Sequence, residues 1–144
     1  MMIKELMTEN PQAAQVNDPI MSVAKMMKDL NVGFMPILDS NKLVGVITDR
    51  DIVIRAIAGG MDFNTPVSDI MSTDLHVISP NDDVEDAADM MEEFQIRRLP
   101  VVDENNNLVG ILSLGDIAVR MGDLEEAGEI LEEISQPSRP EIAA

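Results

Sequence analysis

The chain has 144 residues, with 27 Asp and Glu against 10 Lys and Arg, which gives a formal net charge of −17 at pH 7. Such a surface repels nucleic acids and anionic membranes, because binding to either relies on many Lys and Arg contacts. The absence of cysteine excludes disulfides and thiolate metal sites, and a single histidine, His76, argues against metal binding and histidine-based catalysis. No apolar run approaches the roughly 20 residues of a membrane span and no signal peptide is evident, so we expect a soluble cytoplasmic protein.

The sequence contains one internal repeat. An offset of 64 residues aligns Met7 with Met71, and after one extra residue in the second copy the offset becomes 65 and aligns Asp51 with Asp116. The extra residue falls in Asn105–Asn107, a turn-like run where a duplicated fold tolerates an insertion. We therefore predict two copies of one supersecondary unit, over residues 1–60 and 67–122, joined by a linker at 61–66.

The first copy begins with a short strand-like piece at Ala13–Val16. Asp18 is expected to cap a helix that has Pro19 at its first position, and the apolar residues that follow have helical spacing. A second helix is expected from near Asp51. Between the two helices, turn residues join two short apolar runs and predict a β-hairpin: Met35–Leu38 and Leu43–Thr48.

The second copy has the same order of elements. Val77–Ser79 is strand-like, Asp82 and Glu85 resemble a capping box, and a second helix is expected from near Asp116. The hairpin is predicted from two further apolar runs: Leu99–Val102 and Leu108–Ser113. The expected fold class is α/β (α+β), with two β-α-β-β-α repeats packed as a pseudo-twofold pair.

The tail, residues 123–144, has no counterpart in the repeat. Its apolar residues recur at spacings of three and four on an otherwise acidic segment, which predicts a helix with one packed stripe and a solvated face: Leu124, Ala127, Ile130, Leu131 and Ile134. Docking of a partner is the alternative role for this helix. From Gln136 onward, Pro and Ser residues are expected to end the helix and leave the last residues disordered.

The repeated segments Gly45–Asp51 and Gly110–Asp116 carry the chemistry. Each is a strand that ends in a hydroxyl residue and reaches an Asp three positions later, at a helix start. The hydroxyl and free helix N–H groups can hold a phosphate, and a carboxylate suits the cis-diol of a ribose. The alternative is that both residues are only helix caps. One copy leaves the two interpretations equal, whereas two copies in phase favour a site.

The sequence resembles a tandem pair of cystathionine-β-synthase (CBS) domains, a Bateman module, over residues 1–122. The resemblance rests on G-h-h-T/S-x-x-D in the two segments above, on h-P-h-h-D at Met35–Asp39 and Leu99–Asp103, and on a Met-Ser/Thr opening at Met7 and Met71. In that family the paired domains bind adenosine-containing ligands in two related clefts. The resemblance implies that each cleft takes its opening segment from the opposite repeat. Ser113, Asp116 and Arg98 would then share a site with Ala14-Gln15, and Thr48 and Asp51 would share one with Ile78-Ser79.

The same resemblance assigns ligand contacts to six residues: Thr48, Asp51, Ser79, Arg98, Ser113 and Asp116. It implies that the two aspartates hold ribose hydroxyls and that the threonine and the serine three positions before them lie near phosphate. The arginine corresponds to a basic phosphate contact, and the remaining serine to a hydroxyl of the opening segment.

The two copies differ at the ligand positions. The first has Gly33-Phe34 where the second has Arg97-Arg98, and it has Gln15 where the second has Ser79. We expect the Asp116 site to bind more strongly, because an arginine supplies the charge that a phosphate needs. Arg55 and Arg120 lie four residues after the two aspartates and are expected to form i,i+4 helix pairs, with ligand contact as the alternative.

These features predict a stand-alone regulatory module and not an enzyme. Its ligand would be AMP, ADP or ATP, with S-adenosylmethionine also fitting, and no tightly required cofactor or metal is expected. Binding would be transmitted as a conformational change to an unidentified protein target, and a homodimer is expected. The alternative is a ligand-independent dimerisation or scaffold element, with its face supplied by helix methionines: Met26, Met27, Met90 and Met91.

Overall fold

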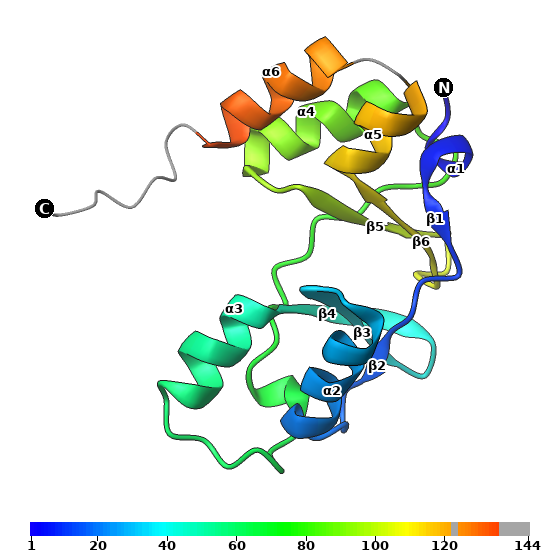
Figure 1. The fold of residues 1–144 in the computed structure, drawn as a ribbon. Coiled ribbons are helices and arrows are strands. Elements are labelled where there is room, and N and C mark those ends of the chain that lie inside the picture. The colour runs from blue at the N-terminus through cyan, green and yellow to red at the C-terminus, as the bar shows by residue number, and fades with distance from the viewer. Residues whose placement is uncertain (122–123, 136–144) are drawn as a thin grey trace, which may run out of the picture. The chain divides into compact units, whose positions relative to one another are not determined.

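The computed structural model describes residues 1–121 and 124–135 and divides the chain into two compact units. Unit 1 comprises Met1–Pro11 and the chain from His76 onward, and unit 2 comprises Gln12–Leu75. Each unit contains a three-stranded sheet with helices packed on it (Figure 1). The predicted α+β class with two repeats is confirmed.

Unit 2 contains the hairpin of the first repeat. Its sheet has the order β2-β3-β4, with β2 parallel and β4 antiparallel to β3. The α3 turn continues directly into η1, whose backbone bonds follow the wider π pattern. The elements of unit 2 are β2 (Ala14–Gln15), α2 (Ile20–Leu30), β3 (Phe34–Asp39), β4 (Lys42–Thr48), α3 (Asp49–Asp51), η1 (Ile52–Ile57) and η2 (Val67–Asp69).

Unit 1 contains the hairpin of the second repeat. Its sheet has the order β1-β6-β5, all antiparallel, and α6 packs against both α4 and α5 (Figure 1). Its elements are α1 (Ile3–Leu6), β1 (Thr8–Glu9), α4 (Val84–Phe94), β5 (Arg98–Val102), β6 (Leu108–Ser113), α5 (Leu114–Met121) and α6 (Leu124–Ser135).

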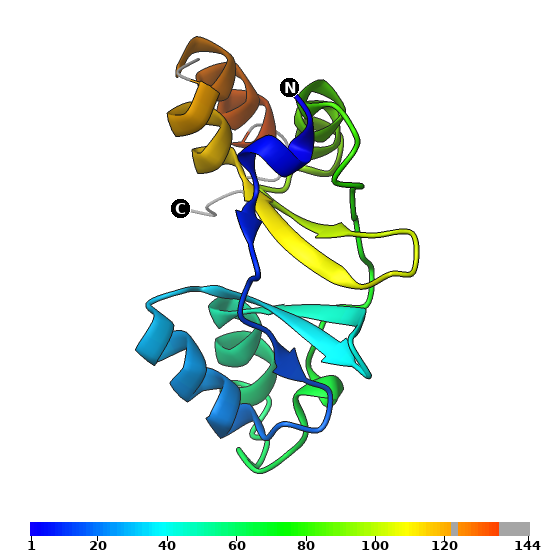
Figure 2. The same ribbon diagram turned by 90° about the vertical axis from the view of Figure 1, so that its right-hand side faces the viewer.

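The opening residues of each repeat pack on the hairpin of the other repeat. Thr8 pairs with Ile111 of β6, and Figure 2 shows β1 beside that strand. In unit 2, Ser72 forms an isolated bridge with Val46 of β4. Hydrophobic periodicity does not predict which hairpin each opening segment joins, because either hairpin could accept a segment of the same pattern.

Both units have aliphatic cores. In unit 2, Val23 and Met27 of α2 and Ala56 of η1 are buried against the inner residues of the sheet. In unit 1, Met91 of α4 and Ile117 of α5 are buried in the same way, with α6 adding further apolar side chains. The cores contain no aromatic residue among the buried side chains of residues 1–121 and 124–135, in agreement with the three Phe of the chain.

The predicted helix starts are wrong by one residue. Pro19 is the N-cap of α2 and Asp83 is the N-cap of α4, where the Asp83 carboxylate accepts a bond from the Glu85 N–H (3.1 Å). The expected caps close the preceding turns instead: the Asp18 carboxylate accepts from the N–H of Gln15 (2.9 Å). The Asp82 carboxylate accepts in the same way from the N–H of Ser79 (3.0 Å).

The two hairpin turns explain the extra residue in the second copy. Ser40 and Asn41 form a two-residue turn with φ of 50° and 68°, the left-handed conformation that tight hairpins require. In the longer turn of unit 1, the Asp103 carboxylate accepts from the N–H groups of Asn105 and Asn107, both at 2.9 Å. The insertion therefore changes the turn and leaves the strand pairing intact.

Two further expectations concern the ends of the second repeat. Val77–Ser79 forms no strand, only a parallel bridge between Ile78 and Val101. The tail helix is confirmed as α6, in which Ile130 and Ile134 are buried while Leu131 is 41% exposed. The expected disorder after Gln136 lies outside the described residues.

Candidate functional site

The two repeated strand–helix turns adopt the same hydrogen-bonded geometry. At the end of β4, the Asp51 N–H donates to the Thr48 hydroxyl oxygen (3.2 Å), and the Thr48 N–H donates to the Asp51 carboxylate (2.9 Å). At the end of β6, the same two bonds join Ser113 and Asp116, at 3.0 and 2.9 Å. The capping interpretation is therefore correct for both pairs, and the ligand role stays a prediction.

The capping bonds to the Thr48 and Ser113 N–H groups use only one carboxylate oxygen of each aspartate. In both pairs the backbone N–H is held by the Oδ2 atom. Asp51 and Asp116 are both half-buried at the surface end of their turns. A carboxylate oriented in this way can still accept hydrogen bonds from a hydroxyl pair.

A glycine in the second strand of each hairpin makes room for the opening methionine. A β-carbon on Gly45 would lie 2.5 Å from the Met71 sulfur and 3.1 Å from the Ser72 carbonyl oxygen. Gly110 makes the same close approach to the Met7 side chain and lies against the Thr8 carbonyl. These contacts explain why the G-h-h-T/S-x-x-D pattern and the Met-Ser/Thr opening occur together.

The repeated arginines bind the same opening segments. Arg55 donates to the Ile70 carbonyl oxygen (3.0 Å), and Arg120 donates to the Met7 carbonyl oxygen (3.1 Å). Arg55 also lies 3.8 Å from the Asp51 carboxylate, so the predicted i,i+4 pair is present in unit 2. Each arginine therefore ties a turn that carries a predicted site residue to the segment exchanged between the repeats.

Unit 1 contains a pocket of about 460 Å³ at the start of α5, which we call the Arg98 pocket. Arg98 and Ser113 are cross-strand partners in β5 and β6, and both line it. Its remaining lining residues come from the strand end, α5 and α6: Arg97, Leu114, Gly115, Ala118, Gly128 and Leu131. The two arginines supply the positive charge that a phosphate needs, whereas the N–H groups of Leu114 and Asp116 at the helix start already donate to Arg97 and Ser113.

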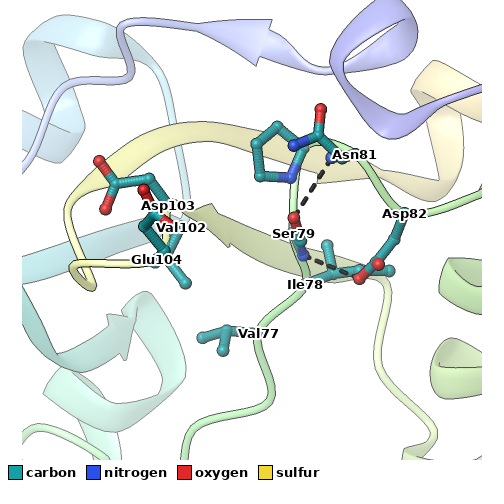
Figure 3. Close-up of a pocket in the computed structure, with 9 residues that line it drawn as sticks. Val77, Ile78, Ser79, Asn81, Asp82, Val102, Asp103 and Glu104 are labelled. Carbon is teal, nitrogen blue, oxygen red and sulfur yellow. Dashed lines mark hydrogen bonds between the residues drawn. The ribbon is translucent and has the colours of Figure 1, made fainter.

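Ser79 lies elsewhere in unit 1. It lines a second pocket of about 560 Å³, together with Ile78, Asp82, Asp103 and Glu104, and we call this the Ser79 pocket. Figure 3 shows the Ser79 hydroxyl on one side and the two turn acids on the other. The Asn81 N–H donates to the Ser79 hydroxyl oxygen (3.3 Å). Within unit 1 the structure thus brings Arg98 and Ser113 together, whereas Ser79 lines a different pocket.

The corresponding turn in unit 2 has a different charge. Phe34 pairs with Thr48 where Arg98 pairs with Ser113 in unit 1. Beside it, a β-carbon on Gly33 would lie 2.9 Å from the Asp49 carboxylate. A carboxylate therefore occupies the space next to Gly33, the residue that aligns with Arg97.

Sequence reasoning missed two contributors to the Arg98 pocket. Gly128 and Leu131 belong to α6, which has no counterpart in the repeat, so alignment of the two copies could not assign them to a site. The apolar stripe of the tail was the available signal, because it indicated that the tail helix packs on the rest of the protein.

The described part of the chain contains neither a membrane-spanning helix nor a cluster of metal ligands. No helix within residues 1–121 and 124–135 is long and apolar enough to cross a membrane. The same part of the chain holds no group of three or more His, Cys, Asp or Glu residues arranged to bind a metal ion.

Comparison with known proteins gives matches over nearly the whole chain. The family model for the CBS domain matches residues 3–57 and 67–123. The CBS domain-containing protein YhcV of Bacillus subtilis is 47% identical over 133 residues, which cover 92% of this chain and 94% of that protein.

Solved structures of similar fold include ligand complexes. CBSX2 in complex with AMP has a TM-score of 0.74 at 26% identity, covering 86% of this chain and 98% of that one. The CBS domain pair of protein MJ0100, in complex with 5′-methylthioadenosine and S-adenosyl-L-methionine, has a TM-score of 0.75 at 30% identity, with coverage of 86% and 98%.

Proposed function

The chain belongs to the CBS-domain family, and on this premise we propose that it is a regulatory module that binds an adenosine nucleotide in the Arg98 pocket. The observation that carries the proposal is the cross-strand pair of Arg98 and Ser113 in one pocket at a helix start. The ligands of the CBSX2 and MJ0100 structures are all adenosine compounds. The pocket volume of about 460 Å³ lies within the usual range for small-molecule sites.

The pocket residues have complementary tasks in this proposal. Arg98 and Arg97 neutralise the phosphate, and the Ser113 hydroxyl donates a hydrogen bond to it. Asp116 does not itself line the pocket but is hydrogen-bonded to Ser113, which does. In this proposal it accepts hydrogen bonds from the ribose hydroxyls through the carboxylate oxygen that does not hold the Ser113 N–H. Leu114 and Leu131 offer apolar surface to the base.

A second site of the same kind is proposed at Thr48 and Asp51, with weaker affinity. The strand partner of Thr48 is Phe34, and the Asp49 carboxylate lies against Gly33. The strand position beside this turn therefore lacks the arginine that unit 1 has, and within the turn the Asp49 carboxylate offsets the charge of Arg50. Ser79 keeps its proposed role as a ligand contact of the opening segment, with its hydroxyl at the wall of the Ser79 pocket.

The test is a thermal-shift panel followed by isothermal titration. The panel contains AMP, ADP, ATP, S-adenosylmethionine and, as a control for the base, GMP. A ligand at about 100 times its Kd stabilises the folded state by roughly 2.7 kcal/mol, which raises Tm by several degrees for a chain of this size. A positive result is a shift with an adenosine compound and saturable heat. A flat panel without heat would overturn the proposal.

We also propose a homodimer that signals to a protein target. Three side chains on η1 are each more than half exposed and lie on one helix face: Val53, Ile54 and Ile57. In unit 1, by contrast, α6 packs against α4 and α5. Large exposed apolar patches usually mark interaction sites, which also favours the second candidate function, a ligand-independent dimerisation or scaffold element. The identity of the target, the cytoplasmic location and the lack of enzyme activity stay predictions.

A further inference from the structure

The C-terminal helix α6 forms one wall of the Arg98 pocket. Gly128 and Leu131 line the pocket, while Ile130 and Ile134 anchor the helix in the core of unit 1. No atom lies within 4 Å of the position that a β-carbon on Gly128 would take, so no side chain projects from the helix at that point. In unit 2, only the short η2 follows η1 within residues 12–75, so that unit has no helix that corresponds to α6. The wall is therefore a specific feature of the pocket in unit 1.

This wall carries negative charge. Glu125 and Glu132 lie three residues before and four residues after Gly128, which places them one helical turn to either side of it on the same face. Both side chains are exposed, and the last turn of α6 holds no basic residue. The Arg98 pocket thus has arginines in its lining at the strand end and carboxylates beside the helix that forms its wall.

We propose that α6 makes the Arg98 pocket selective for a nucleoside monophosphate over the di- and triphosphate. The inference rests on the proposed function and specifies the ligand class of the same site. The two charges of a monophosphate are matched by Arg97 and Arg98. Each further phosphate adds negative charge that no other lysine or arginine lining the pocket offsets and that Glu125 and Glu132 repel.

The experiment compares the ratio of Kd values for ATP and AMP in the wild-type chain and in E125Q/E132Q. Titrations are made in EDTA, so that ATP keeps its full charge. Two carboxylates acting at about 10 Å on two additional ligand charges change that ratio by about threefold at 0.1 M salt, and by more at lower salt. We expect AMP to bind more tightly than ATP in the wild type, and E125Q/E132Q to reduce the difference by about that factor.

The matched control is E9Q/E85Q, which removes the same net charge from unit 1. Glu9 pairs with Gly110, and Glu85 is exposed in the first turn of α4, so neither lies at the Arg98 end of the hairpin. The control should leave the ratio unchanged. A salt series is an independent check, because added salt should reduce the difference between ATP and AMP more in the wild type than in E125Q/E132Q.

The outcomes separate the two proposals. If E9Q/E85Q shifts the ratio as much as E125Q/E132Q does, overall charge and not α6 sets the preference, and the inference fails. If AMP binds but the ratio is the same in all three proteins, the inference fails while the proposed function stands. If neither nucleotide binds any of the three, the proposed function itself fails.

Discussion

Arg98 lies directly opposite Ser113 in the antiparallel pairing of β5 with β6. Both residues line one pocket, and Ser113 also holds Asp116 through reciprocal bonds of 2.9 and 3.0 Å. The strand pairing thus brings the cation of Arg98 beside a hydroxyl and a carboxylate that belong to the turn after the next strand. This arrangement is the basis of the predictions about binding.

Replacing Arg98 should weaken nucleotide binding without unfolding the protein. The side chain is exposed, so R98Q should leave Tm within about 1 °C, because surface changes usually cost less than 0.5 kcal/mol. Loss of a charge-assisted bond to phosphate should raise the Kd for AMP roughly tenfold or more. Titration calorimetry measures the change. The control K28Q removes one positive charge from α2 of unit 2, and an equal loss of affinity there would indicate a nonspecific charge effect.

The two repeated aspartates should differ in importance. In D116N and D51N the amide keeps an oxygen that can accept the backbone bond of Ser113 or Thr48, so the cap is preserved. We expect D116N to raise the Kd for AMP roughly tenfold and D51N to change it little, because Phe34 stands opposite Thr48 where Arg98 stands opposite Ser113. Equal effects of the two substitutions, measured by the same titration, would contradict the ranking of the sites.

The glycine in each repeated segment should be required for packing. In G110A the new β-carbon would meet the Met7 side chain and the Thr8 carbonyl oxygen, which lies 3.1 Å away. Overpacking of this kind costs about 1–3 kcal/mol and should lower Tm by several degrees. Differential scanning calorimetry measures the shift.

The control for this substitution is G128A on α6. Nothing lies within 4 Å of its missing β-carbon, and Ala is a better helix former than Gly by about 1 kcal/mol, so Tm should stay level or rise. If the Tm of G110A equals the Tm of G128A, the opening segment does not pack closely on β6 as described.

The exposed apolar face of η1 should mediate self-association. I54E places a charge on this face, and its counterpart at the aligned position of the second repeat is V119E. Val119 is itself 80% exposed, so the two variants test the same kind of change on different units. We expect I54E to convert a dimer to a monomer in analytical ultracentrifugation, while V119E stays dimeric. A dimer that survives I54E would place its interface elsewhere.

The repeat and the hairpins could be predicted from the sequence because they depend on local patterns. The apolar runs, the turn residues and the aligned hydroxyl–Asp pairs each indicate structure within a few positions. The helix starts were wrong by one residue because neighbouring aspartates, such as Asp82 and Asp83, can both cap, and only the fold decides which turn each closes.

The composition of the Arg98 pocket depends on contacts that the sequence does not encode locally. The exchange of Met7 and Met71 between hairpins and the approach of α6 to Ser113 join segments far apart in the chain. The repeat gave no signal for Leu131, because α6 occurs once. Arg98 was assigned only through the family resemblance, because the first repeat has Phe34 at the same strand position and gives no repeated signal there.

The most direct test of the account is a titration of the isotopically labelled protein with AMP, followed by backbone amide chemical shifts in NMR. We predict saturable shifts at the amides around Arg98, Ser113 and Asp116, with further shifts at Leu131 on the wall of the pocket. Absence of shifts, or saturable shifts confined to Thr48 and Asp51 of unit 2, would contradict the claim that the Arg98 pocket is the nucleotide site.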